Sequence, residues 1–331
     1  MLKILITVDV ETSIGGAFAY PDKFRPVGPE KRIYGRIGSK EYGIPLIMDI
    51  LESFGLKGIF FVEALCSFYF GEKAVQEVAR YVASRGHEVG LHLHPNYQIF
   101  QFEDWPERVR KKELFSDFMA RYPFDHQKEL ISYGRHLLEK AGVQPISFRA
   151  GCFGANNDTL KALKETGFFF DSSFDLSMQG VTCFIKSHKP LNDIAIIEDI
   201  VETPVTNFWT KNYFLKSVLR HFDLCAVSFS EIKYLLERMA NKFQLVTFIL
   251  HSFSFLKKRD VQYHTAKPNY ILIKRFEKLC RYLSNNSDRY QVITYHELQN
   301  FNICPSDEYK IPKGKTSLAL IRYFSQALQY M

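Results

Sequence analysis

The chain alternates short apolar runs with segments in which apolar residues recur every three or four positions. Because strands separated by helices usually run parallel within one sheet, this alternation predicts an α/β fold built from repeated strand and helix units. The strand-like runs include residues 2–10, 57–63, 87–94, 145–150, 168–174, 243–251 and 290–295. The helical segments are 44–54, 74–85, 126–141, 157–166, 228–241 and 269–283.

Composition and charge exclude several classes of protein. Hydrophobic residues make up 46% of the chain and aromatic residues 15%, which is typical of a globular protein and not of a disordered one. The N-terminus lacks a signal-peptide pattern, no apolar run is long enough to span a membrane, and the six scattered cysteines contain no C-x-x-C pair. These features predict a cytoplasmic protein. The net charge of +7 is dispersed and accompanies no recognition motif, so no nucleic-acid partner is expected.

The chain shows no internal repeat and no Gly/Ser-rich linker, so residues 1–300 are predicted to form one domain. Segments 100–125 and 176–227 are interpreted as insertions between its strand and helix units. The remaining residues, 301–331, combine a loop with a helical pattern over 318–330. We expect this extension to pack on the domain or on a partner subunit, with peripheral membrane contact as the alternative. The number of subunits is left open.

Two histidines lie one residue apart in the strand-like run HEVGLHLHP. Residues i and i+2 of a strand point to the same face, roughly 6.6 Å apart, so His92 and His94 share a face while Leu91 and Leu93 occupy the other. Pro95 ends the strand because it has no N–H to donate. Two imidazoles at a strand end can bind one metal ion, since Zn²⁺ and similar metals accept neutral histidine nitrogen.

The first strand carries two carboxylates in the same relation. In TVDVE, Asp9 and Glu11 share one face, and two adjacent carboxylates require a cation, a proton or an arginine nearby. A catalytic metal site usually has three protein ligands and one open position. Glu11, His92 and His94 would supply three ligands and leave Asp9 free for other chemistry.

Three further ionisable residues, Arg149, Asp171 and His251, follow other predicted strands. Together with Asp9 and His92 they mark the carboxyl ends of five strands. An open sheet gathers its ligand mainly at the strands around one switch point, whereas a closed barrel brings all strand ends to one mouth. The distribution therefore favours a barrel.

The motifs TVDVE, GHEVGLHLHP, FRAGCFGANNDTLKALKETGFFFDSS and VTFILH, in this order, resemble those of the polysaccharide deacetylase family, the NodB-homology group of carbohydrate esterases (family 4). The resemblance implies a distorted (β/α) barrel of about seven parallel strands, here with loop insertions and a C-terminal helical tail. It also implies one divalent metal ion, with zinc expected and cobalt, nickel or manganese as alternatives. The activity implied is the removal of an acyl group, usually acetyl, from an amino sugar.

Carried over by position, the resemblance makes Asp9 the catalytic base, which Arg149 would steady, and His251 the general acid. Glu11 and His92 become metal ligands, although the family usually has aspartate in the position of Glu11. The family's second histidine usually follows the first by four residues, where this chain has Asn96; strand geometry favours His94 instead. The acidic partner of the last histidine is left open between two residues, Asp171 and Glu202.

Two other functions remain as alternatives. Amidohydrolase-like and phosphoesterase barrels also use an H-x-H pair, but on the first strand, which here carries carboxylates. A non-catalytic saccharide-binding barrel is the second alternative, and the departures at Glu11 and Asn96 favour it. For an enzyme, the expected substrate is an N-acetylated saccharide, and a nucleotide- or lipid-linked sugar in glycan biosynthesis fits a cytoplasmic location better than a finished polymer.

Overall fold

The computed structural model describes residues 1–302 and 311–330, with side chains described for 1–302 and 311–323. Among the described residues, its main sheet has nine strands. Seven parallel strands and one antiparallel edge strand lie side by side, and an eighth parallel strand, β15 (Tyr290–Val292), pairs with the start of β1. The order is β12 (Leu245–His251), β1 (Leu2–Val10), β4 (Ile59–Glu63), β5 (Glu88–Leu93), β6 (Ser147–Ala150), β7 (Phe170–Asp171), β9 (Ile200–Glu202) and the antiparallel β8 (Ala195–Ile197). The predicted α/β fold with about seven parallel strands is confirmed.

The sheet curls, and irregular chain rather than a strand pair connects its two edges. The segment after β9 crosses from β7 to β12, because the Val205 N–H donates to Phe174 O (3.0 Å) and the Thr206 N–H donates to Thr247 O (3.2 Å). The returning chain also joins β12, where the Ile249 N–H donates to Phe222 O at 3.0 Å. We call segments 203–206 and 222–224 the seam. The seam makes the barrel distorted, as the resemblance implied.

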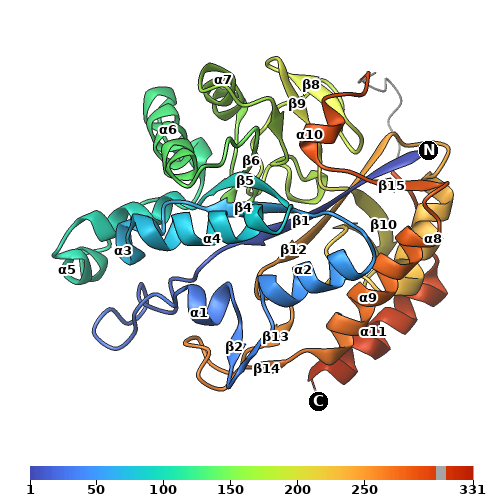
Figure 1. Ribbon diagram of the computed structural model, residues 1–331, viewed down its shortest axis with the longest axis horizontal. Helices are drawn as coiled ribbons and strands as arrows, with labels where there is room; N and C mark the ends of the chain where they lie inside the picture. The colour runs from blue at the N-terminus through green and yellow to red at the C-terminus, as the bar shows by residue number, and fades with distance from the viewer. Residues whose placement is uncertain (303–310, 331) are drawn as a thin grey trace.

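Helices form a layer outside the curled sheet (Figure 1). Neighbouring helices contact one another along this layer, in the pairs α7–α6, α6–α4, α2–α9, α9–α8 and α8–α11. Both ends of all six predicted helical segments lie within two residues of their predicted positions. The helices are α1 (Pro29–Arg32), α2 (Ile44–Ser53), α3 (Ser67–Phe70), α4 (Glu72–Ser84), α5 (Trp105–Arg110), α6 (Phe124–Lys140), α7 (Asn157–Glu165), α8 (Phe229–Met239), α9 (Tyr270–Ser284), α10 (Tyr295–Leu298) and α11 (Thr316–Tyr330). The short 3-10 helices are η1 (Pro95–Gln101), η2 (Met119–Arg121), η3 (Gly151–Phe153) and η4 (Leu176–Met178).

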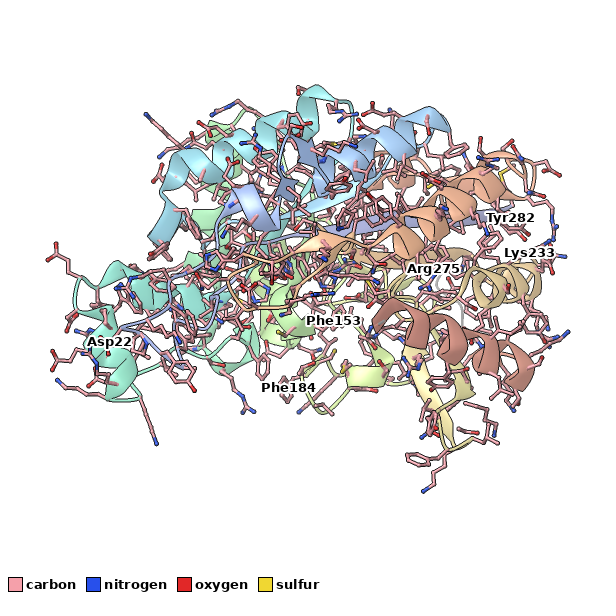
Figure 2. All side chains as sticks on the ribbon, turned by 90° about the horizontal axis from the view of Figure 1, so that it is seen from below. Asp22, Phe153, Phe184, Lys233, Arg275 and Tyr282 are labelled. Atoms are coloured by element: carbon pink, nitrogen blue, oxygen red, sulfur yellow. The ribbon has the colours of Figure 1, made fainter. Side chains whose placement is uncertain are left out.

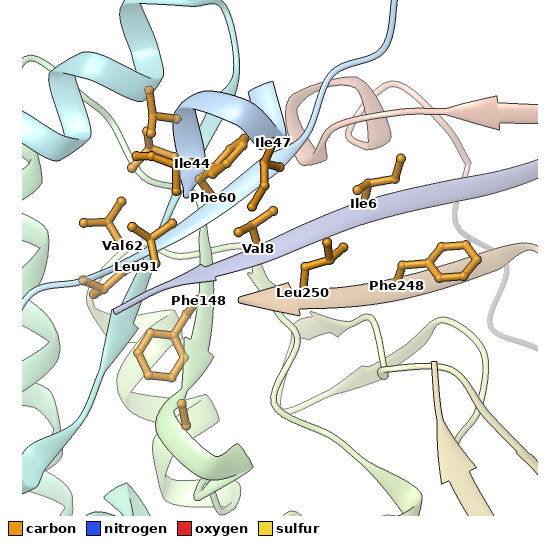
Figure 3. Packing of buried hydrophobic residues seen from close by; sticks show 14 of the residues in the cluster. Ile6, Val8, Ile44, Ile47, Phe60, Val62, Leu91, Phe148, Phe248 and Leu250 are labelled. Carbon is orange, nitrogen blue, oxygen red and sulfur yellow. The ribbon is translucent and has the colours of Figure 1, made fainter. Parts of the chain in front are cut away.

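Alternate residues of β1 face two different cores. Ile6 and Val8 pack toward α2, on the side where Ile44 and Ile47 lie (Figure 3). Leu5, on the opposite face, belongs to a smaller cluster inside the barrel. Each fully buried aliphatic side chain contributes about 1.5–3 kcal/mol, so this pattern fixes which face of β1 points inward. The inward face continues to Asp9 at the barrel mouth.

The two predicted insertions contain short elements of their own. Segment 100–125 holds α5 and η2, and segment 176–227 holds η4, β8, β9 and a projecting hairpin. That hairpin is formed by β10 (Asn207–Lys211) and β11 (Ser217–His221). Two further antiparallel pairs lie elsewhere, β2 (Arg36–Ile37) with β3 (Lys40–Glu41) and β13 (Leu256–Lys257) with β14 (Lys267–Pro268).

The C-terminal helix α11 packs against α8 and the hairpin. Its Arg322 forms an ion pair with Glu231 at 2.7 Å, with both side chains fully buried. Before the helix, the Trp209 N–H donates to Pro312 O at 2.9 Å. Residues 303–310 of the predicted extension lie outside the described residues, and the domain boundary near 300 stays a prediction. None of the described helices combines the length and the apolar character needed to cross a membrane.

Candidate active site

The carboxyl ends of the parallel strands surround a cavity of about 290 Å³. The carboxyl end of a barrel is where catalytic residues gather in folds of this kind. The cavity is lined by Asp9, Glu11, His92, His94, Ala150, Cys152, Phe153, His221, Ile249 and His251. Figure 2 locates Phe153 near the middle of the molecule when it is viewed from below. Five of the six predicted site residues therefore line one pocket, and the sixth, Arg149, lies directly behind it.

Asp9 and Arg149 form an ion pair at the base of the pocket. The Arg149 Nη1 lies 2.7 Å from Asp9 Oδ1, with the arginine side chain fully buried and the aspartate 6% exposed. Two more donors of the guanidinium are used by Ser172, whose carbonyl and hydroxyl oxygens accept at 3.1 and 2.9 Å. The guanidinium also lies 4.5 Å from the centre of the Phe61 ring, a cation–π distance. These contacts hold the arginine in one position and leave the second oxygen of Asp9 toward the pocket.

The His92 ring is fixed by the backbone of the same arginine. His92 Nδ1 lies 2.8 Å from Arg149 O, and a carbonyl can only accept, so Nδ1 carries the proton and Nε2 presents a lone pair. Burial lowers the pKa of His92 to about 4, which favours the neutral ring. A buried neutral histidine with one nitrogen hydrogen-bonded to a carbonyl is the usual form of a metal ligand.

His94 lies between two carboxylates. Its Nε2 is 3.0 Å from Glu11 Oε2, and its Nδ1 is 2.9 Å from Asp117 Oδ1. Burial opposes ionisation of Glu11, but His94, His251 and Arg32 together hold the pKa of that carboxyl below its usual range. Glu11, His92 and His94 each place a ligand atom within 4.8 Å of those of the other two. Nitrogen, nitrogen and carboxylate oxygen form a donor set that suits Zn²⁺ and related divalent metals.

Two residues support the turn that carries His94. The Glu63 carboxylate, at the end of β4, accepts the backbone N–H groups of His94 (3.2 Å), Leu65 (2.8 Å) and Cys66 (2.6 Å). Burial raises the pKa of Glu63 to about 7. Gly151 packs against the His94 ring, where an added Cβ would lie only 2.6 Å from the ring atoms. The position therefore requires glycine.

His251 completes the pocket at the end of β12. Its Nε2 lies 4.0 Å from Asp9 Oδ2 and 3.7 Å from Glu11 Oε1, with the side chain 30% exposed. Arg32, from the segment after β1, approaches Glu11 at 3.8 Å, and its guanidinium stacks on the Phe253 ring at 3.2 Å. The pocket thus combines Asp9, Glu11 and His251, from the ends of β1 and β12, with two histidines from the end of β5, His92 and His94.

Three residues whose roles the sequence left open do not line the pocket: Asn96, Asp171 and Glu202. Asn96 is in η1 and is not among the residues that line the pocket, so the geometry brings His94, not Asn96, to Glu11 and His92. Asp171 and Glu202 are fully buried and face each other across β7 and β9. Burial raises the pKa of both carboxyls, and neither lies within ion-pair distance of His251 among the contacts of the described residues.

Sequence reasoning missed several residues of the site. Glu63 ends a predicted strand, and the rule that selected Asp9 and His92 would have selected it too. Asp117 lies in an insertion without regular periodicity, and no local pattern links it to His94. Cys152 and Phe153 adopt left-handed backbone angles, with φ of 52° and 59°, at the pocket edge. That Cys152 and Phe153 line the pocket could be learned only from the three-dimensional structure.

No protein-family model and no curated protein matches this sequence. Solved structures do match. A candidate polysaccharide deacetylase from Mycobacterium smegmatis superposes with a TM-score of 0.50 and 15% identity, over 94% of this chain and 95% of that one. The chain has the fold of the polysaccharide deacetylases. A family 4 carbohydrate esterase from Streptomyces lividans, solved with acetate, also matches, with a TM-score of 0.44 and 10% identity over 92% of this chain and 98% of that one.

The polysaccharide deacetylase fold is not confined to one chemistry. A 4-alpha-glucanotransferase from Thermococcus litoralis matches with a TM-score of 0.50 and 14% identity, over 91% of this chain and 40% of that one. The same barrel is therefore found in an enzyme named for a different reaction. Because a fold does not determine a function, the activity has to be argued from the side chains of the pocket.

Proposed function

We propose that the protein is a metal-dependent hydrolase that removes an N-acyl group, foremost N-acetyl, from an amino sugar. The observation that carries this proposal is the pairing of two arrangements in one pocket, the Asp9–Arg149 ion pair and the cluster of Glu11, His92 and His94. The first supplies an ionised carboxylate held in place, and the second supplies three metal donors. The polysaccharide deacetylase fold is consistent with both.

The residues fit a divalent metal ion. Glu11, His92 and His94 would hold it, with Zn²⁺ expected and Co²⁺, Ni²⁺ or Mn²⁺ as alternatives. When bound, such an ion supplies Lewis acidity toward an acyl oxygen and lowers the pKa of water. Asp117 supports the same role, because a carboxylate on the outer nitrogen of a histidine ligand orients the ring and raises its basicity.

The other residues handle protons and orientation. Asp9 is the proposed base: the 2.7 Å contact with Arg149 aims its carboxylate, so it can accept a proton from the attacking water. His251 is the proposed acid, since it lines the pocket opposite Asp9 and an imidazolium can protonate the departing amine nitrogen. Positioned acids and bases of this kind contribute roughly 10²–10⁴-fold each to rate.

The pocket size supports a substrate that presents one sugar residue. A cavity of about 290 Å³ lies at the small end of the range for ligand sites, which fits a single N-acetylated sugar. We propose that this sugar is linked to a nucleotide or a lipid, as in the assembly of glycans in the cytoplasm. Activity confined to mature polymer would contradict this part of the proposal.

The test has two steps. Metal analysis of the purified protein is followed by measuring acetate release from N-acetylated saccharides, nucleotide-linked sugars and polymer. His92→Ala should lose metal and activity together, whereas Asp9→Asn should keep the metal and lose turnover. Normal acetate release by either variant would show that its assigned role is wrong. Metal binding with hydrolysis of phosphate esters alone would favour the phosphoesterase alternative, and saccharide binding without turnover would favour the binding module.

A further inference from the structure

The pocket is lined by four histidines, and the proposed mechanism does not use one of them. His221 ends β11 and lines the cavity together with His251. Its Nδ1 lies 2.7 Å from Asp175 Oδ2, in an ion pair whose aspartate is fully buried and whose histidine is 21% exposed. The Phe153 ring lies beside the imidazole, with a centroid separation of 5.9 Å. His221 is therefore held by a buried carboxylate on one side and reaches the pocket on the other.

Asp175 is itself fixed by neighbouring donors. Its Oδ1 accepts the Ser177 N–H at 2.8 Å, the Ser177 hydroxyl at 2.6 Å and the Asn207 amide at 3.2 Å. Burial opposes ionisation of Asp175, but His221, with Ser177 and Asn207, outweighs burial and lowers the pKa of its carboxyl. Burial opposes protonation of His221, but the Asp175 charge outweighs it, and the pKa of the imidazole is raised.

His251 has a different environment. Its Nε2 faces Asp9 and Glu11, the two carboxylates that the proposed mechanism already uses. Among the described residues, no carboxylate lies within ion-pair distance of its Nδ1. A histidine that is oriented by a buried aspartate through Nδ1 and exposes Nε2 is better prepared to deliver a proton than one without such a partner.

We propose that His221, oriented by Asp175, delivers the proton to the departing nitrogen in place of His251, and this inference rests on the proposed N-deacylation. As the amide C–N bond breaks, the departing nitrogen takes the proton from His221 Nε2, and the imidazole becomes neutral. The proton that Asp9 took from water returns to solvent, and solvent reprotonates His221. Asp175 acts as a positioning residue, because it touches His221 and not the substrate.

The experiment separates acid catalysis from folding by varying the leaving group. A departing amine needs a proton, whereas 4-nitrophenolate leaves without one. His221→Gln should lower kcat for an N-acetylated amino sugar by roughly 10²-fold and leave hydrolysis of 4-nitrophenyl acetate close to that of the wild type. Asp175→Asn should show the same split with a smaller loss, and the exposed His188→Gln is the matched control.

Two outcomes would overturn the inference. An equal loss on both substrates would mean that His221 is structural, and no loss on either would leave His251 as the acid. In both cases, acetate release by the wild type would still uphold the proposed function. A metal-loaded wild type that releases no acetate from any substrate overturns the proposed function and this inference with it. A thermal melt of each variant checks that the fold is retained.

A second inference rests on a different surface, the tip of the β10–β11 hairpin. Three consecutive apolar residues are exposed there: Tyr213 is 75%, Phe214 is 77% and Leu215 is 53% exposed. Leu215 has a φ of 58°, and the loop is closed by the Asn212 side chain, which accepts the Lys216 N–H at 2.9 Å. A positive φ is unfavourable for a bulky residue. The tip therefore exposes three large apolar side chains to solvent.

The charge around this tip indicates the partner. Residues 207–221 contain two lysines and one arginine but no aspartate or glutamate, and Lys313 and Lys315 follow in the adjoining segment. The hairpin, yellow in Figure 2, extends beyond the rest of the molecule. An apolar tip that is flanked by cations fits the interface of an anionic bilayer, where aromatic rings insert and nearby lysines are attracted to the anionic lipids. We propose that the hairpin tip docks this protein on an anionic membrane surface.

Vesicle sedimentation tests this inference without any activity measurement. The wild type should bind vesicles that contain phosphatidylglycerol more tightly than vesicles of phosphatidylcholine alone, with binding weakened by salt. The triple variant Tyr213→Ser/Phe214→Ser/Leu215→Ser should lose this binding, and Val181→Ser, which removes an exposed apolar residue elsewhere, should retain it. Equal binding by the triple variant would overturn the inference. So would a concentration-dependent dimer that the triple variant abolishes, because the partner would then be a second copy.

Discussion

Replacing Arg149 with methionine should destabilise the protein strongly, because the change leaves Asp9 as a buried charge without its partner. The two side chains are 0% and 6% exposed and lie 2.7 Å apart, so solvent screens the pair very little. Removing one partner of a buried pair typically costs about 3–5 kcal/mol. At about 1.36 kcal/mol per tenfold, this corresponds to a change of roughly 10²–10⁴ in the unfolding equilibrium constant.

The assay is urea unfolding followed by circular dichroism. The double variant Asp9→Asn/Arg149→Met removes both charges and should recover at least about 2 kcal/mol relative to the single variant. Arg110→Met is the matched control, since its partner Asp22 is exposed and the unfolding midpoint should not change. The metal donors should survive in Arg149→Met, because the contact to His92 uses the Arg149 carbonyl and not its side chain.

Two results would refute this reasoning. One is an Arg149→Met variant within about 1 kcal/mol of the wild type, which would mean that water reaches Asp9 and replaces the arginine. The other is a double variant as unstable as the single one. The lost contacts to Ser172 would then account for the cost, and the charge of Asp9 would not.

Three further predictions follow from the remaining contacts. Asp117→Asn should weaken metal binding about 10–100-fold without unfolding the protein, as measured by calorimetric metal titration, because His94 loses the carboxylate that orients it; unchanged affinity would exclude that role. Burial lowers the pKa of His87 in the folded state, so the unfolded chain takes up the proton first and stability falls as pH drops below about 6.5. His87→Asn should flatten this dependence between pH 7.5 and 5.5 in urea titrations, and an unaltered slope would contradict it. Arg322→Met should release α11 and make it sensitive to limited proteolysis, whereas continued resistance would show that the buried ion pair does not hold the helix.

The sequence predicted the parts of the site that depend on strand periodicity. Because side chains alternate along a strand, the spacing in TVDVE and GLHLH placed Asp9 with Glu11 and His92 with His94, and the structure brings all four to one pocket. Helix positions were predicted within two residues, since the apolar pattern of each helix is regular.

The rest depends on register and on irregular chain, which leave little trace in the sequence. Asp171 and Glu202 both end strands, but the register of β7 against β9 places them opposite each other, so they pair with one another and not with His251. Asp117 reaches His94 from an insertion with no periodic pattern. Asp175 and His221 lie 46 residues apart, in two segments that meet only because the chain returns along the seam.

That return has a consequence for how a protein of this fold could diversify. The hairpin leaves the barrel after Thr206 and re-enters at Phe222, and these two residues are joined directly, with the Phe222 N–H donating to Thr206 O at 2.8 Å. Everything between them forms a loop with a common anchor, so its length and composition can change while the parallel ladder stays intact. His221 is the last residue before that anchor. A lineage that exchanged this excursion would keep Asp9, Glu11, His92 and His94 in place, and would change the side of the pocket that His221 lines.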